Sequence, residues 1–128
     1  MNLEPLYTTT VRVAGARIVH SDGRLDGIRP GTSPEQLLAA SYAACVHRTL
    51  CLLTADKDID MRNVVIHAHF TCRRNEEDGS PLYEAHVDVD MPGVCAELAA
   101  MLMKSVEEIC PYAKMARNGI LANVLQAA

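Results

Sequence analysis

The sequence predicts an α+β protein, because a stretch rich in threonine and valine and a later stretch of alternating polar and apolar residues flank a long apolar segment that begins with helix-start signals. A further helical pattern follows the second stretch. The expected order is a β-hairpin, a helix, a second β-hairpin, a second helix and a final strand. The chain has 128 residues and no evident linker, so residues 1–128 are expected to form a single domain.

The first hairpin is expected over residues 6–20, which are rich in threonine and valine and turn at residues 14–16. A short strand around residues 24–28 is expected after the turn at residues 21–23. Pro30 and Gly31 then close this β region.

The long helix is expected to begin at Pro34, a residue that suits the first helical position. Ser33 is a good N-cap, and Gln36 follows it by three residues as in a capping box. The run from there through Thr54 is apolar on nearly every side, which predicts a helix that is buried all round. A chain of this size has few elements to cover such a helix, so we expect a homodimer that buries two copies together.

The second hairpin is expected to pair residues 61–73 with residues 83–91 across a turn at residues 75–81. Apolar residues alternate with polar ones along both strands, which predicts one dry face. The apolar set is Val64, Ile66, Ala68, Phe70 and Cys72 on the first strand and Tyr83, Ala85, Val87, Val89 and Met91 on the second.

Residues 94–109 carry apolar side chains at helical spacing. This second helix must end near Cys110, because the residue before Pro111 is pushed out of the helical conformation. Residues 111–118 are expected to form another helical segment with Gly119 as its C-cap, and residues 120–125 a final strand.

Composition excludes several classes of partner. The formal net charge is −4, lysine and arginine are scattered, and there is no tryptophan and one phenylalanine, so a nucleic-acid partner is not expected. No stretch reaches the roughly 18 apolar residues that a membrane span needs, and the N-terminus has no secretory signal. We therefore expect a cytoplasmic protein with no membrane partner.

The five cysteines stand at positions 45, 51, 72, 95 and 110, without a CxxC pair. An odd number in a reducing compartment argues against a disulfide scaffold. Each thiol is either chemically active or a small buried apolar group. Cys45 lies about three turns inside the long helix, too far from its N-terminus for the helix dipole to activate it. If Cys45 reacts, a cation must lower its pKa, and the candidates are Arg17, Arg24, Arg29 and Arg48.

Two segments carry a resemblance to a known family. GTSPEQLLAASYAAC at residues 31–45 and CPYAKMARNGI at residues 110–120 resemble the two active-site segments of the OsmC/Ohr hydroperoxide reductases. LYTTTVRV at residues 6–13, HSDG at residues 20–23 and the PG turn at residues 92–93 extend the similarity over most of the chain. The resemblance implies antiparallel β-sheets wrapped around two central helices in an intertwined homodimer.

The resemblance also implies roles for individual residues. Cys45 is similar to the peroxidatic cysteine, Cys110 to the resolving cysteine, and Glu35 to the carboxylate that orients an arginine over the reactive thiol. Arg17 matches that arginine by its distance from Tyr7, and Arg48, three residues after Cys45 on the same helix face, is the alternative within the helix.

The Cys-Pro-Tyr run favours the Ohr branch of the family. That branch implies organic hydroperoxides as substrates, reduction to the alcohol through a Cys45 sulfenic acid and a Cys45–Cys110 disulfide, recycling by a dithiol such as a lipoylated protein, and no cofactor. Glu35 and Cys45 are ten residues apart on one expected helix, roughly 15 Å at 1.5 Å per residue. We therefore expect Glu35 to serve the Cys45 of a partner chain.

Two other functions remain open. His67, His69 and His86, with His20 nearby, are candidates for a metal site on the polar face of the central hairpin. Alternatively, the fold is kept while turnover is weak, and Cys45 acts as a redox sensor or the pocket binds an apolar ligand.

Overall fold

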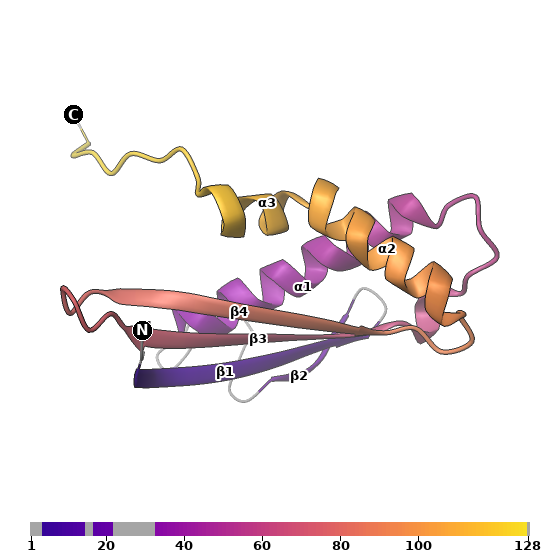
Figure 1. Ribbon diagram of the computed structural model, residues 1–128, viewed down its shortest axis with the longest axis horizontal. Helices are drawn as coiled ribbons and strands as arrows, with labels where there is room; N and C mark the ends of the chain where they lie inside the picture. The colour runs from indigo at the N-terminus through magenta and orange to yellow at the C-terminus, as the bar shows by residue number, and fades with distance from the viewer. Residues whose placement is uncertain (1–3, 15–16, 22–32, 128) are drawn as a thin grey trace.

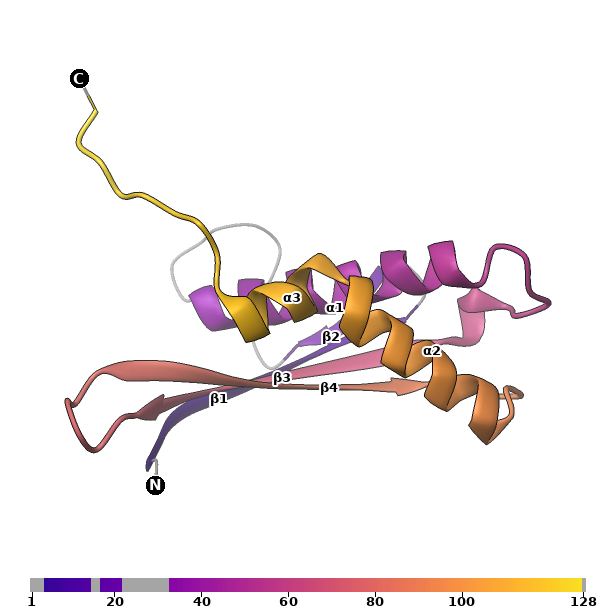
Figure 2. The same cartoon turned by 45° about the horizontal axis from the view of Figure 1, so that its top comes forward.

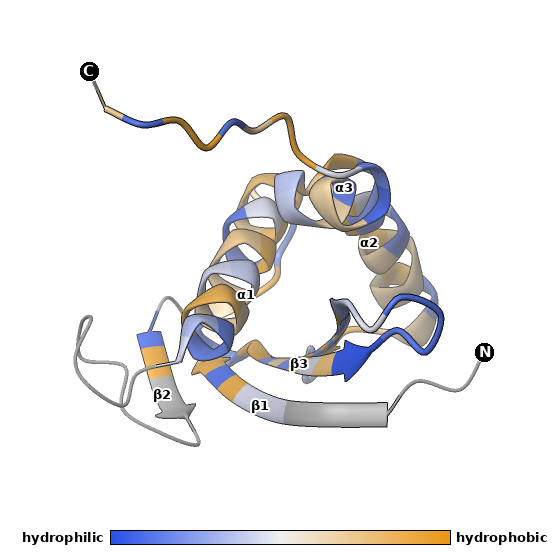
Figure 3. Ribbon diagram, turned by 90° about the vertical axis from the view of Figure 1, so that its left-hand side faces the viewer, coloured by the Kyte–Doolittle hydropathy of each residue, from blue (hydrophilic) through white to orange (hydrophobic). Residues whose placement is uncertain are grey.

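The computed structural model describes residues 4–14, 17–21 and 33–127. Within these residues, four antiparallel strands form one sheet in the order β2-β1-β3-β4, and three α-helices lie on one face of it (Figures 1 and 3). The predicted α+β class is confirmed. The elements are β1 (Glu4–Ala14), β2 (Arg17–Ser21), α1 (Pro34–Leu53), β3 (Val65–Arg74), β4 (Pro81–Asp90), α2 (Ala96–Ile109) and α3 (Pro111–Asn118).

The first hairpin forms as predicted, with β1 antiparallel to β2. β1 also pairs with β3 over its whole length, so it is an interior strand of the sheet. The strand expected around residues 24–28 lies outside the described residues.

The second hairpin also forms, but its first strand begins later than expected. Residues Met61–Asn63 make a 3₁₀ turn, because the Asp60 side chain accepts a hydrogen bond from the Arg62 backbone N–H at 3.0 Å and so caps the turn. The predicted start of the strand at residue 61 is therefore wrong by four positions. On the face toward the helices the expected apolar residues Ile66, Ala68 and Phe70 of β3 are buried, as is Val64 just before the strand, while Cys72 is half-buried.

α1 begins at Pro34 with the predicted capping box. The Ser33 hydroxyl accepts a hydrogen bond from the Gln36 N–H at 3.1 Å, and the Gln36 side chain accepts one from the Ser33 N–H at 2.9 Å. Such a cap contributes about 1 kcal/mol to helix stability. α1 packs on β1 and β3, and its side chains in the core are Ala39, Ala40, Ala43, Cys45, Val46 and Leu50.

One face of α1 is exposed in the single chain, so the predicted burial of the helix all round, in a core or between subunits, stays a prediction that needs a second copy. Ala44, Arg48 and Leu52 are spaced by four residues and form a stripe along the helix. Leu52 is 73% exposed. Among the described residues, the sheet and the other helices cover the opposite face, so this stripe of two apolar side chains and one arginine remains exposed.

α2 and α3 are consecutive helices separated by a sharp break (Figure 2). Cys110 is both the C-cap of α2 and the N-cap of α3, and its backbone is extended, with φ −64° and ψ 123°. Pro111 imposes this break, as the sequence predicts. Gly119 ends α3 with φ 79°, the left-handed region that favours glycine at a C-cap.

The predicted final strand over residues 120–125 does not form in the single chain. Residues 119–127 have no regular secondary structure and extend away from the sheet and helices (Figures 1 and 2). A strand needs a neighbouring strand to satisfy its backbone groups, and the tail pairs with none in the described part of the chain. Its apolar side chains are exposed, Leu121 and Val124 almost completely.

None of the described helices is both long and apolar enough to cross a membrane.

Candidate thiol site

Two cysteines that are 65 residues apart in sequence meet in the interior. The Sγ atoms of Cys45 and Cys110 lie 3.5 Å apart, and the Cys110 thiol donates a hydrogen bond to Cys45. Cys45 is 6% exposed and Cys110 is fully buried. The thiol of α1 therefore contacts the thiol at the break between α2 and α3.

The break between the helices positions Cys110. The Cys110 N–H donates to the Val106 carbonyl at 2.8 Å, which completes the last turn of α2, and the Cys110 carbonyl accepts from Lys114 N–H at 3.0 Å in the first turn of α3. Ala113 of α3 is buried in the core cluster that also contains both cysteines. The backbone at Cys110 is thus held from both sides while its side chain faces α1.

Several groups act on the pKa of Cys45. Burial has the largest effect and raises the pKa, because the charged thiolate loses water. A hydrogen bond from the Tyr112 backbone N–H to the sulfur lowers the pKa, the neighbouring Cys110 raises it, and the charge of Arg48 lowers it. The resulting pKa lies above the ordinary thiol value.

The Tyr112 contact is a feature that the sequence argument missed. Cys45 is too far from the N-terminus of its own helix, α1, for that helix dipole to lower its pKa. It lies instead beside the N-terminus of α3, where the first backbone N–H groups have no partner within the helix and can bind a thiolate. The sequence contains a sign of this helix N-terminus, because proline, here at position 111, is common as the first residue of a helix.

Aromatic rings wall the thiol pair. Tyr42 packs edge-on against Tyr112 and Phe70, with ring centroids 5.6 Å and 5.8 Å apart. Burial raises the pKa of Tyr42, with further contributions from Cys110 and Cys45. Tyr42 is therefore a neutral neighbour of the pair at physiological pH.

A cavity of about 310 Å³ opens on Cys45. Its lining consists of Ser41, Ala44, Cys45, Arg48 and Tyr112. Arg48 is exposed and is the only charged residue in the lining of this cavity. A small molecule that enters here meets the sulfur and the guanidinium together.

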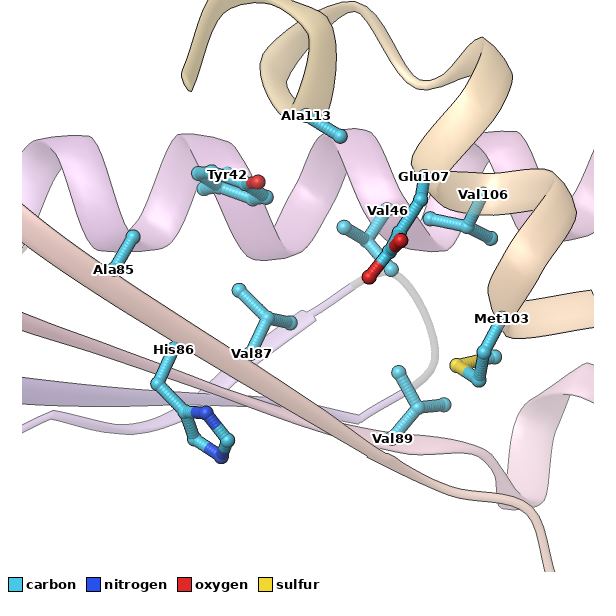
Figure 4. A pocket seen from close by; sticks show the side chains of 10 residues that line it. All are labelled: Tyr42, Val46, Ala85, His86, Val87, Val89, Met103, Val106, Glu107 and Ala113. Carbon is cyan, nitrogen blue, oxygen red and sulfur yellow. The ribbon is translucent and has the colours of Figure 1, made fainter. Parts of the chain in front are cut away.

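A second cavity, of about 320 Å³, lies on the other side of Tyr42, between α1, β4 and α2 (Figure 4). Figure 4 shows Val87 and Val89 of β4 facing Tyr42 and Val46 of α1, and the Glu107 carboxylate pointing into the space between them. Besides this carboxylate and the Tyr42 hydroxyl, the lining includes His86, and its other side chains are apolar.

The other two predicted site residues are not beside Cys45 in the same chain. Arg17 is an exposed residue of β2 and is not among the described groups whose charge acts on Cys45. Glu35 lies in the first turn of α1 and accepts a hydrogen bond from the Tyr83 hydroxyl at 3.2 Å. α1 runs unbroken from Glu35 to Cys45, so the two remain roughly 15 Å apart. Arg24 and Arg29 lie outside the described residues.

The histidines of the central hairpin are paired with one carboxylate. Asp88 lies 3.2 Å from Nδ1 of His67 and 3.1 Å from Nε2 of His69, and the Thr10 hydroxyl lies 2.9 Å from the other nitrogen of His69. Among the described residues, no group of three or more His, Cys, Asp or Glu is arranged to hold a metal ion. These contacts fit a solvated polar face, on the side of the sheet away from the thiols.

Comparison with known families decides the classification. A family described as OsmC-like protein matches residues 25–124. The chain belongs to the OsmC-like protein family. Its curated relatives include the organic hydroperoxide resistance proteins OhrA and OhrB of Bacillus subtilis (strain 168). OhrA is 31% identical and aligns over 91% of this chain and 93% of its own length, and OhrB is 30% identical over 90% and 93%.

Solved structures agree with this assignment. The crystal structure of Bacillus subtilis OhrB matches with a TM-score of 0.62 at 27% identity, covering 88% of this chain and 92% of that one. An organic hydroperoxide resistance protein from Elizabethkingia anophelis matches with a TM-score of 0.62 at 25% identity, covering 88% and 90%. The OsmC/Ohr fold predicted from the two cysteine segments is therefore confirmed.

Which arginine serves Cys45 is testable in this OsmC-like protein. Replacing Arg48 by Met is expected to raise the pKa of Cys45, because a positive charge near the thiolate is lost. Only the thiolate reacts with alkylating agents, so the pH profile of Cys45 alkylation should move to higher pH and the rate at neutral pH should fall.

The same change at Arg17 is the matched comparison. If the profile moves only in the Arg17→Met variant, Arg17 from a second copy supplies the charge, and Arg48 does not activate the thiol. An unchanged profile in both variants would rule out both assignments.

Proposed function

We propose that this protein is a thiol peroxidase that reduces organic hydroperoxides to alcohols, with Cys45 as the peroxidatic and Cys110 as the resolving cysteine. The observation that carries the proposal is the 3.5 Å separation of two buried sulfur atoms from distant segments. The names of the relatives, which describe organic hydroperoxide resistance, agree with this chemistry.

The reaction begins with the Cys45 thiolate. It attacks the peroxide oxygen remote from the alkyl group, the O–O bond breaks, and the alkoxide takes up a proton and leaves as the alcohol. Cys45 is left as a sulfenic acid. The Tyr112 N–H and a nearby guanidinium favour the thiolate and stabilise the negative charge that develops on the leaving oxygen.

Cys110 then attacks the sulfenic sulfur, water leaves, and a disulfide forms. An S–S bond is about 2.05 Å long, so the two sulfurs must approach by roughly 1.5 Å. The backbone at Cys110 is non-helical, and a small adjustment of this residue closes the gap. An external dithiol, of the lipoyl type in the proposal, attacks the disulfide and returns both thiols.

An organic substrate is supported by the surroundings of the pair. The cavity at Cys45 presents Ala44 and Tyr112 beside one cation, and the cavity beyond Tyr42 is lined by four valines, two alanines and one methionine together with Tyr42, His86 and Glu107. Apolar walls favour an alkyl or aryl hydroperoxide over hydrogen peroxide.

We further propose that the working unit is a homodimer in which Glu35 and Arg17 of one copy complete the site around Cys45 of the other. The exposed stripe of α1 and the apolar tail over residues 119–127 support this, because both leave apolar surface uncovered in one chain. The unbroken α1 helix supports it as well, since it keeps Glu35 away from its own Cys45.

A steady-state assay tests the proposed function. The reduced protein is given cumene hydroperoxide, tert-butyl hydroperoxide or hydrogen peroxide, with dithiothreitol and then a lipoylated protein as reductant. We expect repeated turnover with the two organic hydroperoxides and slower consumption of hydrogen peroxide. If folded protein with intact thiols consumes no more than one equivalent of any peroxide, it is a sensor or a binding protein rather than a peroxidase.

A further inference from the structure

Glu35 has a partner on the far side of its own chain that the proposed reaction does not use. The Tyr83 hydroxyl, on β4, donates a hydrogen bond of 3.2 Å to Oε1 of Glu35, in the first turn of α1. The capping box of α1 is formed by Ser33 and Gln36, so the Glu35 carboxylate is not needed to cap the helix. Tyr83 therefore holds a carboxylate that is available for another role.

The Glu35 carboxylate is half-buried and has no cation beside it in one chain. Within the described residues its side chain forms no ion pair, and its one hydrogen bond comes from the neutral Tyr83 hydroxyl. A carboxylate accepts hydrogen bonds through both of its oxygens. Because Tyr83 occupies Oε1, Oε2 remains available for a guanidinium, the group that Glu35 meets in the proposed two-chain site.

Packing fixes the ring that carries this hydroxyl. Tyr83 is the cross-strand partner of Cys72 on β3 and contacts Phe70 edge-on, with ring centroids 6.4 Å apart and planes at 72°. Phe70 is buried in the core, so it is a rigid support. Tyr83 itself is 50% exposed. One side of the ring therefore rests on the core, while its hydroxyl reaches the start of α1.

The charge state of Tyr83 suits a donor. Burial raises the pKa of the Tyr83 hydroxyl, and the negative charge of Glu35 raises it further. The hydroxyl is therefore protonated at physiological pH and donates to the carboxylate. A hydrogen bond to an ionised acceptor is shorter and stronger than one between neutral groups, so it restricts the carboxylate more firmly.

We propose that Tyr83 is a positioning residue for the peroxidase reaction, and that its hydroxyl holds Glu35 so that the second carboxylate oxygen binds the arginine that activates Cys45. This role rests on the proposed function. Tyr83 touches neither the reactive sulfur nor the substrate, and it acts only through Glu35. A guanidinium binds a carboxylate in a fixed planar geometry, so a carboxylate that turns freely orients the arginine less well.

A double-mutant cycle on the full chain tests this role. Tyr83→Phe removes the hydroxyl and keeps the ring that packs on Phe70, and Glu35→Ala removes the carboxylate. Two quantities are measured for the unmodified protein, both single variants and the double variant. One is the rate of Cys45 oxidation by cumene hydroperoxide in a single turnover. The other is the pH profile of Cys45 alkylation, which needs no peroxidase activity.

Thr71→Val is the matched control. It removes a hydroxyl of the same hairpin that also forms a hydrogen bond of 3.2 Å, to Thr8, but on the face of the sheet away from the helices. Its oxidation rate and its alkylation profile should equal those of the unmodified protein. A Thr71→Val protein as slow as Tyr83→Phe would mean that any loosening of the hairpin slows Cys45, and would overturn the positioning role.

We expect Tyr83→Phe to slow Cys45 oxidation about tenfold, as the loss of one hydrogen bond to a charged group does, and to move the alkylation profile to higher pH. In the Glu35→Ala protein the same change should have no further effect. An equal effect of Tyr83→Phe with and without Glu35 overturns the positioning role, as does an unchanged rate and profile in the folded Tyr83→Phe protein.

Failure of the proposed function gives a different result. If the unmodified protein consumes no hydroperoxide, the peroxidase assignment is wrong, and the alkylation profiles alone decide the role of Tyr83. A profile that moves in Tyr83→Phe, but does not move further when the change is added to Glu35→Ala, supports that role. Profiles that coincide in all four proteins overturn it.

Discussion

Replacing Cys45 by serine is expected to lower the rate of organic hydroperoxide consumption at least about a thousandfold, as removal of an enzyme nucleophile generally does. A serine hydroxyl remains protonated at neutral pH and does not form the sulfenic intermediate. The Cys110→Ser variant is expected to complete one turnover and stop, with sulfenic acid trapped at Cys45. The two changes are distinguished by stopped-flow measurement of alcohol release and by dimedone labelling.

Cys95→Ser is the control for this experiment, because Cys95 is exposed and lies at the start of α2, away from the thiol pair. It should retain the activity of the unmodified protein. Full turnover by the Cys45→Ser variant would mean that another thiol performs the reaction, and the assignment of Cys45 would be wrong.

Mixing two inactive variants is expected to restore activity if the site is shared between chains. In a heterodimer of Cys45→Ser and Glu35→Ala, one site contains a normal Cys45 from one chain and a normal Glu35 from the other. About half of the unmodified activity per dimer should return when subunits exchange, since one of two sites is complete.

The matched control is a mixture of Cys45→Ser with Cys110→Ser. Both thiols of a site come from the same chain, 3.5 Å apart, so neither site of this heterodimer has a complete pair and turnover should not return. Heterodimers that are shown by native mass spectrometry to have formed, yet recover no activity with Glu35→Ala, would contradict a shared site.

Most of the fold follows from local sequence signals. The Ser33 capping box, the alternation along β3 and β4, and the Pro111 break each specify a local backbone conformation that one chain satisfies by itself. The pairing of β1 with β3 is a long-range contact, and the sequence predicts the strands but not this neighbour.

The wrong prediction of a strand at residues 120–125 concerns a surface that the described residues of one chain leave uncovered. Residues 120–125 are mostly apolar, yet the described chain has no strand beside them, so they remain without regular secondary structure and exposed. The exposed stripe of α1 that ends at Leu52 is not covered by the described residues either. Local patterning predicts that a segment is apolar, but not whether the same chain or a second copy covers it.

Part of the candidate site was likewise predictable from the sequence, and part depends on how the helices pack. The resemblance of two segments predicts the Cys45 and Cys110 pair, and the structure brings their sulfurs together. The help that Cys45 receives from the Tyr112 N–H depends on how α3 packs on α1, which no local pattern specifies. The roles of Arg17 and Glu35 stay predictions, because neither lies beside the thiol within one chain.

The most direct test of the central claim is disulfide mapping after one equivalent of cumene hydroperoxide is added to the reduced protein. Mass spectrometry of peptides, with and without prior reduction, identifies the linked cysteines. The proposed function predicts that Cys45 and Cys110 are joined in nearly every molecule and that a dithiol separates them. Recovery of both as unlinked thiols, while the peroxide has been consumed by Cys51, Cys72 or Cys95, would contradict it.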